Sequence, residues 1–535
     1  MNIEEKIINE ISKILKIDVD NISLEIPKDK KNGDYSSNVC LKNSKILGKK
    51  PIDIATIIKD NLKEDYIEKI EIALPGFVNF FLKKDYLFNN VLDIIEQGSN
   101  YASFKPNNTK VNLEYVSANP TGILHLGHAR GACYGASLAK IMQKAGYDVT
   151  REYYVNDAGN QMNNLGISIK ERYREVLGYG SNLPENGYHG KEIIEIANIL
   201  KEKYNDTLLD KDVEYFKNVG LEILLDKIKK DLSNINIEFD VWTSEQSLYN
   251  DKKIDKVLEK LKNDNETYIK DDALYLKTTE YFDDKDRVLI KSDGAYTYFL
   301  PDIAYHNDKY NRGFDIIIDV LGSDHHGYIN RLKSSMEILN NDSKKLEIKI
   351  LQMVRLIKDG KEFKMSKRTG NSITINELRE MIGTDALRYF YVTKSLDTQM
   401  DIDIDLATSK NSENPVYYIQ YAHARICSIL NTAKEKNIEL SKTLRTIDNN
   451  YAYDIMKKLY CYKDIINLSA KKRLPHIITN YIYELASLFH SYYANEKIIT
   501  DDYEYSSERI TLITAINIVI KDALNLIGVS APNKM

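Results

Sequence analysis

The spacing of hydrophobic residues changes along the chain, and the first pattern predicts a small mixed domain. The sequence opens with an amphipathic helical segment, has a second helical segment at 51–62, and then alternates apolar and polar residues through 67–82 around Pro75-Gly76. Alternation interrupted by a central turn is typical of a β-hairpin. Residues 1–98 are therefore predicted to form an N-terminal α+β domain, and the polar stretch at 105–109 a linker.

The second pattern alternates β-like and helical segments. A β-like run at 111–116 is followed by a helical segment at 125–145 and a second β-like run at 148–155, which together predict a βαβ unit. This order favours a Rossmann-like, doubly wound parallel sheet, which we assign to a domain at 108–405. Charged helical sequence at about 160–234 is interpreted as an insertion. Five later β-like runs are expected to resume the sheet: 272–278, 287–292, 295–300, 314–322 and 346–354.

The third pattern is helical throughout. After about residue 405, apolar residues recur at helical spacing through 416–430, 477–493 and 513–528. Residues 406–535 are therefore predicted to form an α-helical bundle.

The composition narrows the class of protein. A chain of 535 residues with 43% hydrophobic and 29% charged residues is typical of a soluble globular protein of several domains, and excludes a disordered chain. No run approaches the roughly 20 apolar residues that a membrane-spanning helix needs. The four cysteines are scattered without a CxxC pair, which fits a cytoplasmic location. Because the net charge is -5, any contact with nucleic acid must come from local groups of Lys and Arg.

The first chemical signal is the segment at 116–131, where the first β-like run passes into a helix. It contains His125-Leu126-Gly127-His128. Helix N-termini at this position in parallel sheets favour phosphate, and Gly127 would let a nucleotide approach the backbone. The two imidazoles could donate hydrogen bonds to phosphate oxygens during displacement at phosphorus. The alternative roles are metal ligands or polar surface, but there is no third ligand at zinc spacing, so zinc is not expected.

The second signal is Lys364-Met365-Ser366-Lys367-Arg368, in a Gly-rich loop at 359–371. Lysines on either side of a small hydroxyl residue could fold over a triphosphate and neutralise the departing pyrophosphate. The alternative is an ordinary basic surface loop. The occurrence of this loop about 240 residues after the histidine pair, with βαβ sequence between them, favours the functional interpretation.

Together the two signals resemble the HIGH and KMSKS signatures of class I aminoacyl-tRNA synthetases. Further blocks along essentially the whole chain are similar to the arginyl-tRNA synthetases, among them VSANPTG, REYYVNDAGNQM, GTDALRYFYV and DALNLIGVSAPNKM. The resemblance implies an arginine–tRNA ligase, which activates L-arginine with ATP and Mg²⁺ to arginyl-adenylate and pyrophosphate. It further implies transfer of arginine to the 3′-terminal ribose of its tRNA, at the 2′-hydroxyl.

The resemblance also implies roles for individual residues. The implied catalytic residues are His125, His128, Lys364 and Lys367. The implied arginine-binding residues are Ser117, Asn119, His128, Tyr298, Asp302 and His325, the last where many relatives have glutamine. The implied ATP-binding residues are His125, Gly127, His128, Gly322, Asp324, Lys364, Met365, Ser366 and Lys367.

The residue types in the implied arginine pocket agree with that substrate. Asn119 offers a donor and an acceptor for an ammonium and a carboxylate group. A guanidinium pairs with a carboxylate such as Asp302 and can stack on a ring such as Tyr298. The alternatives are a core aromatic for Tyr298 and a helix N-cap for Asp302.

The two ends of the chain resemble tRNA-binding domains of the same family. The implied contact residues are Asn38, Phe77 and Asn79 near the N-terminus, and Tyr417, Tyr421, His423, Arg425 and Met535 near the C-terminus. Each of them could equally be a core or solvent-facing residue. The expected partners are arginine tRNA, L-arginine and ATP, with no membrane and a monomeric enzyme.

Two other functions are compatible with part of the sequence. A HIGH-type enzyme that makes a small-molecule adenylate would not need the two end domains. A catalytically silent tRNA-binding relative would be expected to have lost part of either signature, whereas both are intact.

Overall fold

The computed structural model describes residues 3–25, 27, 29–323, 327–363 and 373–535. Its N-terminal part is an α+β unit in which a sheet of order β1-β2-β4-β3 packs against helices. The expected helix at 51–62 and hairpin at 67–82 are confirmed, since β3 pairs antiparallel with β4. The elements of this unit are α1 (Ile3–Leu15), β1 (Leu24–Glu25), β2 (Tyr35–Ser37), α2 (Val39–Leu47), α3 (Pro51–Asn61), β3 (Ile67–Ala73), β4 (Phe77–Leu82) and α4 (Lys84–Gln97).

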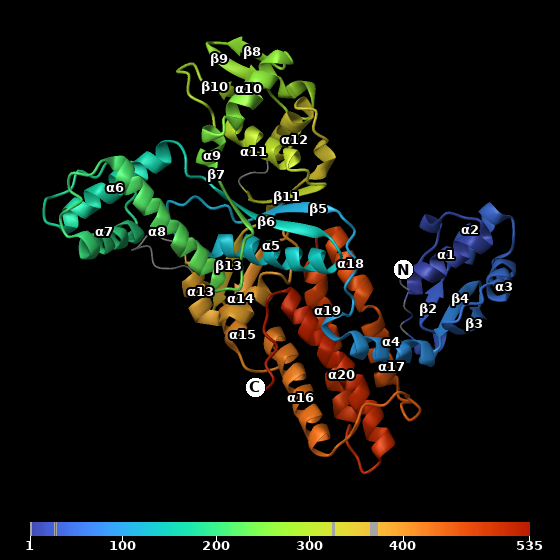
Figure 1. The fold of residues 1–535 in the computed structure, drawn as a ribbon. Helices are drawn as coiled ribbons and strands as arrows, with labels where there is room; N and C mark the ends of the chain where they lie inside the picture. The colour runs from blue at the N-terminus through green and yellow to red at the C-terminus, as the bar shows by residue number, and fades with distance from the viewer. Residues whose placement is uncertain (1–2, 26, 28, 324–326, 364–372) are drawn as a thin grey trace.

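The centre of the molecule is a parallel sheet of order β12-β11-β5-β6-β7. Its strands are β5 (Lys110–Glu114), β6 (Asp148–Val155), β7 (Val241–Ser244), β11 (Ile316–Gly322) and β12 (Leu346–Leu351). Helix α5 (Leu126–Lys144) covers one face, and α11 (Phe299–Asn311) and α12 (Tyr328–Ile338) lie on the other (Figure 1). This arrangement confirms the doubly wound fold. Because the strand order reverses beside β5, a crevice is expected at the carboxyl ends of β5 and β11.

Two expectations about the sheet are wrong. The runs at 272–278 and 287–292 form β9 (Ala273–Leu276) and β10 (Arg287–Ile290), which join β8 (Thr267–Lys270) in a separate antiparallel sheet. The β-like pattern of a run does not reveal its pairing partner, and these strands pair with their neighbours in sequence. The run at 295–300 is not a strand, because α11 begins at Phe299, and Pro301 is tolerated in the first turn of a helix.

Helices dominate the rest of the chain. Between β6 and β7, the helices α6 (Asn160–Val176), α7 (Lys191–Tyr204) and α8 (Val213–Ser233) enclose a small core of their own. After α9 (Glu245–Asn250) and α10 (Lys253–Asn263), the remaining short elements are β13 (Val354–Lys358), β14 (Lys361–Glu362), α13 (Ile375–Ile382), α14 (Thr384–Phe390), β15 (Met400–Asp403) and α15 (Ile404–Thr408). No helix within the described ranges is long and apolar enough to cross a membrane.

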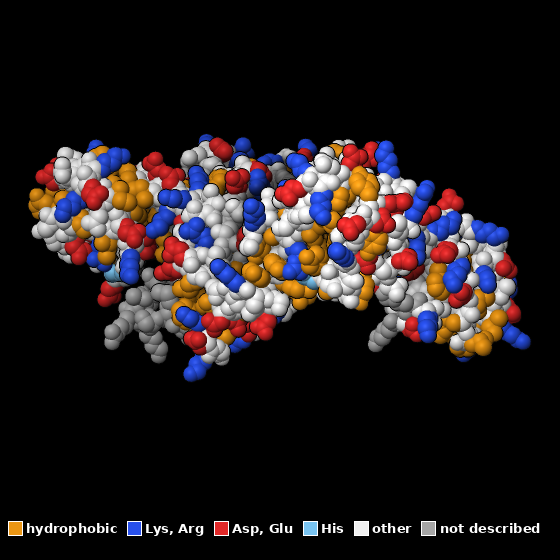
Figure 2. Space-filling view, turned by 90° about the horizontal axis from the view of Figure 1, so that it is seen from below, with side chains coloured by type: hydrophobic (Ala, Val, Ile, Leu, Met, Phe, Trp, Pro, Cys, Tyr) orange, Lys and Arg blue, Asp and Glu red, His pale blue; other side chains and the backbone are white. Residues whose placement is uncertain are grey.

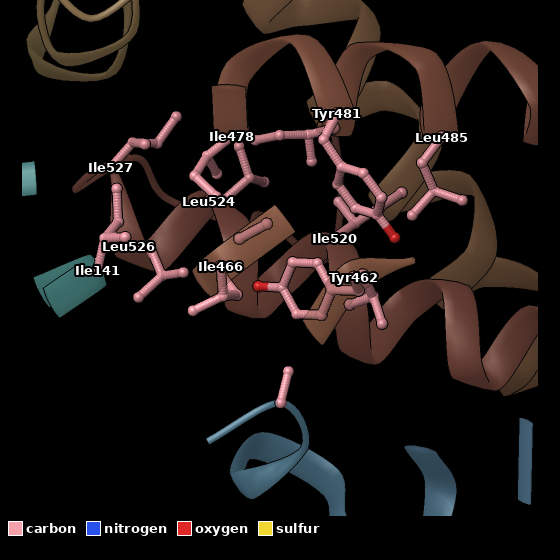
Figure 3. Packing of buried hydrophobic residues seen from close by; sticks show 14 of the residues in the cluster. Ile141, Tyr462, Ile466, Ile478, Tyr481, Leu485, Ile520, Leu524, Leu526 and Ile527 are labelled. Atoms are coloured by element: carbon pink, nitrogen blue, oxygen red, sulfur yellow. The ribbon is translucent and has the colours of Figure 1, made fainter. Parts of the chain in front are cut away.

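The C-terminal bundle lies below the sheet and against α5. Its helices are α16 (Pro415–Glu435), α17 (Asn450–Tyr460), α18 (Tyr462–Lys472), α19 (His476–Asn495) and α20 (Tyr503–Leu526). Figure 3 shows apolar side chains of α18, α19 and α20 packed together, with Ile141 of α5 beside Leu526. The bundle and the sheet therefore share one hydrophobic core.

The N-terminal unit is attached to the bundle through a buried carboxylate. Asp34 accepts hydrogen bonds from the backbone N–H of Leu82, the hydroxyl of Tyr453 and Nζ of Lys457, each at 2.9 Å. Helix α4 also packs against α17 and α20. This joint gives the N-terminal unit a defined position at one end of the molecule (Figure 1).

The packing of α5 on β5 predicts a measurable loss of stability. A Cβ atom at Gly135 would lie 2.2 Å from Cγ of the buried Tyr115 ring, so Gly135→Ala is expected to lower the free energy of unfolding by about 1–3 kcal/mol. The control is Gly327→Ala at the start of α12, where an added Cβ would meet no atom within 4 Å. Thermal melts should show the larger loss for Gly135→Ala; equal melts would contradict this account of the α5 packing.

Candidate active site

Two adjoining hollows lie at the carboxyl ends of the central strands. The first, of about 590 Å³, includes His125, Gly127 and His128, and we call it the histidine cleft. The second, of about 500 Å³, is lined by four carboxylates, and we call it the acidic pocket. These carboxylates are Glu114, Glu245, Asp302 and Asp319. The residues that line both hollows are Val116, Ser117, Asn119, Val320 and Gly322.

The histidine cleft is formed by the first turn of α5. His125 is the N-cap, and its Nδ1 accepts a hydrogen bond from the backbone N–H of Gly127 at 3.1 Å. Nδ1 of His128 accepts from the backbone N–H of His125 at 3.2 Å, and the two ring centroids are 3.8 Å apart. An imidazole whose Nδ1 accepts a hydrogen bond carries its proton on Nε2. Each ring therefore has an Nε2–H group that can donate.

Both imidazoles are neutral near pH 7. Burial lowers the pKa of His125, while burial together with the neighbouring His125 lowers the pKa of His128 to about 4. The pair can therefore donate hydrogen bonds to an anion as neutral imidazoles, each from its Nε2–H group. A Cβ at Gly127 would come within 3.1 Å of the His125 ring, so glycine at this position also leaves room for that imidazole.

The boundary between the two hollows is a strained loop. Val116 and Ser117 have φ angles of 71° and 38°, in the left-handed region that β-branched residues rarely adopt. The Ser117 hydroxyl donates to Glu114 at 2.8 Å and accepts from the backbone N–H of Tyr154 at 3.1 Å. These two bonds hold the loop so that the exposed Asn119 faces both hollows.

The acidic pocket is lined by the start of α11. Tyr298 is the N-cap residue of this helix and is 72% exposed, while Asp302 lies inside the helix and accepts a hydrogen bond from the hydroxyl of Tyr328. The alternative role of Asp302 as the helix N-cap is therefore wrong. Tyr298 is likewise not a core aromatic.

Glu245, the first residue of α9, lines the acidic pocket and was not predicted from the sequence. Its side chain is buried, and burial together with the charges of Asp302 and Asp157 raises its pKa to about 7. Glu114 and Asp319 were also missed. Asp319 has a usable signal, because a charged residue interrupts the apolar run IIIDVL, whereas Glu245 lies in a polar segment without such a signal.

Several residues assigned to ATP and arginine lie outside the described residues: Asp324, His325, Lys364, Met365, Ser366 and Lys367. The chain that follows them is attached directly to the histidine segment. Leu126 N–H donates to the Ile373 carbonyl at 3.0 Å, and Ile375 N–H donates to the Leu124 carbonyl at 2.9 Å. Residues 373–375 therefore lie directly beside the histidine segment.

A buried arginine fixes the other side of the histidine cleft. Arg130 donates to the backbone carbonyls of Gln352, Ser395 and Thr398 at 2.7–2.8 Å, and its side chain is fully buried. Gln352 lines the histidine cleft, so this clamp ties α5 to the segment that forms the opposite wall.

The tRNA-contact candidates lie at the two ends of the molecule. Asn38 and Phe77 are partly exposed on the N-terminal unit, whereas Asn79 is 4% exposed and accepts a hydrogen bond from Ser36 at 2.8 Å. In the bundle, the Tyr417 and Tyr421 rings are stacked at 6.0 Å, and the Arg425 guanidinium lies 4.5 Å from the centre of the Tyr421 ring.

The C-terminal tail borders a hollow of about 690 Å³. Tyr417, Gln420 and Met535 line this hollow, and Met535 is 53% exposed. His423 is buried, and its Nδ1 lies 3.0 Å from the Pro532 carbonyl, so His423 holds the tail from inside the bundle.

Among the described residues, no group of three or more His, Cys, Asp or Glu side chains is placed to hold a metal ion.

Comparison with protein families gives three matches that together span most of the chain. The family described as tRNA synthetases class I (R), catalytic domain, matches residues 90–390. The Arginyl tRNA synthetase N terminal domain matches 1–82, and the DALR anticodon binding domain matches 419–535.

Individual relatives match over their full length. An arginine–tRNA ligase of Staphylococcus carnosus is 48% identical over 100% of this chain and 99% of its own, and one of Staphylococcus aureus is 50% identical over 97% and 95%. Among solved structures, Thermus thermophilus arginyl-tRNA synthetase has a TM-score of 0.78, with 19% identity over 100% of both chains. The enzyme from Plasmodium falciparum has a TM-score of 0.74, with 19% identity over 100% of this chain and 98% of its own.

The Arg130 clamp predicts a specific stability difference. Arg130→Met would remove the guanidinium donor from three partly buried carbonyls, of which that of Ser395 keeps the backbone N–H of Thr398 as a donor. Each group left unsatisfied costs about 1–3 kcal/mol, so the melting temperature should fall markedly. Arg355→Met is the control, because Arg355 pairs with Asp401 at the surface and its loss should change the melt little. A melt of Arg130→Met as high as that of Arg355→Met would contradict the proposed importance of the clamp.

Proposed function

The chain belongs to the arginyl-tRNA synthetase family, and on this basis we propose the role of individual residues in each step of the reaction. The enzyme is an arginine–tRNA ligase, which activates L-arginine with ATP and transfers it to tRNA. The observation that carries the assignment of residues is the acidic pocket opening beside the histidine cleft, with Asn119 between them. The carboxylates of the acidic pocket suit a cation, and the imidazole donors of the histidine cleft suit a phosphate.

The arginine side chain enters the acidic pocket. Its guanidinium lies between the carboxylates of Asp302 and Glu245, and the exposed ring of Tyr298 stacks on it at the entrance. Asn119 binds the α-amino and α-carboxylate groups, which places the carboxylate at the edge of the histidine cleft. His325 would complete the amino-acid site.

The α-carboxylate then attacks the α-phosphorus of Mg-ATP, and the bond to the bridging oxygen of pyrophosphate breaks. The Nε2–H groups of His125 and His128 donate to the oxygens of the transferring phosphoryl group. Because both rings are neutral and already oriented by backbone N–H groups, they need no rearrangement as charge develops. Lys364 and Lys367 hold the pyrophosphate as it leaves, with Mg²⁺ bound to ATP as part of the substrate.

In the second step a ribose hydroxyl at the 3′ end of the tRNA attacks the carbonyl carbon of the adenylate, and AMP leaves. We assign this role to the 2′-hydroxyl. No protein nucleophile takes part, so the residues of the two hollows act by positioning and by hydrogen bonding.

The tRNA is proposed to contact both ends of the molecule. Tyr417, Tyr421 and Arg425 form an aromatic and cationic surface that suits unpaired bases, beside the hollow that Met535 borders. Asn38 and Phe77 would make the contact at the N-terminal unit, with Asn79 holding Ser36 behind them. Figure 2 shows Lys and Arg scattered among Asp and Glu over the face seen from below, so phosphate contacts there would come from individual cations and not from one basic patch.

In this assignment residues 1–98 form a tRNA-contacting domain, 108–405 a catalytic domain and 406–535 an anticodon-binding domain. The enzyme acts as a monomer in the cytoplasm, where the free thiols of Cys40 and Cys133 would stay reduced.

The arginine assignment is tested by Asp302→Asn. This change keeps the size and the acceptor for the Tyr328 hydroxyl but removes a charge, so kcat/KM for arginine is expected to fall several hundredfold, from a cost of roughly 3–5 kcal/mol. Asp308→Asn is the control on the same helix, because Asp308 pairs with Lys253 and Arg312 and does not line the acidic pocket. Aminoacylation assays and melts are measured for both variants. Full activity of Asp302→Asn with an unchanged melt would contradict the assignment of the acidic pocket to the arginine guanidinium.

The pH dependence tests Glu245. Its pKa of about 7 means that the carboxyl is mostly neutral at pH 6 and mostly charged at pH 8, so kcat/KM for arginine should rise across this interval. Glu245→Gln should lose this rise and have a lower activity at pH 8. Because the charge of Asp302 helps to raise that pKa, Asp302→Asn should move the rise to lower pH. A rise that persists in Glu245→Gln would assign it to another group.

A further inference from the structure

A fully buried lysine lies behind the acidic pocket. Nζ of Lys309, in α11, donates to Glu114 at 2.5 Å and to Asp319 at 2.7 Å, and the side chain is 0% exposed. It also lies 4.5 Å from the centre of the Tyr305 ring. Burial alone would lower the pKa of Lys309, but Asp319 and Glu114 hold it above its ordinary value. The ammonium group is therefore a permanent positive charge inside the protein.

The partners of Lys309 form the far wall of the acidic pocket. Glu114 and Asp319 face each other in the register of the neighbouring strands β5 and β11, and both line the pocket. Asp302, four residues after the exposed Tyr298 on α11, and Glu245 also line this pocket. Asp302 and Lys309 are seven residues apart on α11, so their Cα atoms are separated by roughly 10 Å along the helix axis.

Two chains of contacts lead from Lys309 to the substrate-facing residues. On one side, Asp319 lies 2.9 Å from Nε2 of His306, whose Nδ1 lies 2.8 Å from the backbone carbonyl of Asp302. On the other side, Glu114 accepts from the hydroxyl of Ser117, which borders the histidine cleft. Both oxygens of Glu114 are therefore occupied by protein donors, one by Ser117 and one by Lys309.

The number of carboxylates in the pocket exceeds what one substrate can neutralise. Four carboxylates line the pocket, whereas arginine brings a single guanidinium. Without Lys309, Glu114 and Asp319 would form a second cation site farther along α11. A guanidinium drawn into that site would pull the α-carboxylate away from the histidine cleft, and displacement by about 1 Å can cost about 10²-fold in rate.

We propose that Lys309 is a specificity-determining residue that occupies Glu114 and Asp319 from inside the protein, so that the guanidinium of the substrate stops at Asp302 and Glu245. Lys309 thereby sets how deep the amino acid enters and which chain length brings its carboxylate to the phosphorus. This inference rests on the proposed assignment of the acidic pocket to arginine.

The test compares arginine with homoarginine, which has one more methylene group. In the full-length wild-type enzyme with tRNA present, kcat/KM for homoarginine should be at least about tenfold below that for arginine. In Lys309→Met, kcat/KM for arginine should fall by about 10²-fold with the KM for ATP unchanged. The ratio of homoarginine to arginine activity should rise by about tenfold, because the added methylene group lets the guanidinium shift toward the vacated carboxylates while the α-carboxylate stays at the histidine cleft.

Lys144→Met is the matched control. Lys144 is also largely buried and paired with a carboxylate, Asp522, but it lies at the opposite end of α5 from the histidines. Its loss should leave both amino-acid parameters unchanged. A purely structural role for Lys309 would instead lower the melting temperature and kcat without changing the preference between the two amino acids.

Three outcomes would overturn the inference. One is equal use of the two amino acids by the wild type, and another is an unchanged ratio in folded Lys309→Met. If Lys309→Met does not fold, the double variant Lys309→Met/Glu114→Gln removes one charge of each sign. The homoarginine-to-arginine ratio is expected to rise in it as well, because Asp319 still loses its ammonium partner. The third outcome is an unchanged ratio in this double variant. Full arginine activity of Asp302→Asn would instead refute the pocket assignment itself.

Discussion

Carboxylates buried side by side in the register of β5, β6 and β11 require cations beside them, and this requirement shapes the centre of the molecule. An unpaired buried charge costs several kcal/mol, so each carboxylate must be matched by a donor from a neighbouring element. Glu152 of β6 is held by Arg312, just beyond the end of α11, at 2.8–3.0 Å. Together with Lys309, this fixes α11 against three strands at once. The wall of the acidic pocket is therefore positioned before any substrate is present.

The same electrostatics separates the two hollows. A triphosphate is repelled by the carboxylates of the acidic pocket, while the N-terminus of α5 and two neutral imidazole donors favour it in the histidine cleft. A guanidinium experiences the opposite preference. The two hollows share the strained loop at 116–117, so under the proposed assignment the α-carboxylate of arginine would lie close to the histidine cleft. Opposite charges would then orient the two proposed substrates toward one another.

Local patterns were sufficient to predict the βαβ unit, the N-terminal hairpin and the helical bundle, because each depends on periodicity within a short segment. The pairing of β8, β9 and β10 could not be predicted in this way, since the choice between a neighbouring strand and the central sheet depends on tertiary packing. The site divides similarly. His125, Gly127 and His128 are recognisable because they are contiguous, whereas Glu245 becomes part of a site only when α9 folds next to α11. Asp302 was identified through family resemblance, and its local sequence alone favoured a different role.

The connection between the bundle and the active site has a physical basis in a second buried arginine. Arg388 of α14 donates to the Ile527 carbonyl at 3.0 Å and to the Ser137 hydroxyl at 3.2 Å, and so joins the end of α20 to the middle of α5. A Cβ at Gly528 would lie 2.5 Å from this guanidinium, which leaves glycine as the residue that fits the turn. Helix α5 carries His125 and His128 at its N-terminal end, so one continuous hydrophobic core supports both the histidine cleft and helix α16. A long folded ligand that is bound at one end reaches the reacting carbonyl with its other end only if the distance between the two binding sites is fixed. Variation in that distance would reduce the accuracy of positioning on which the second step depends.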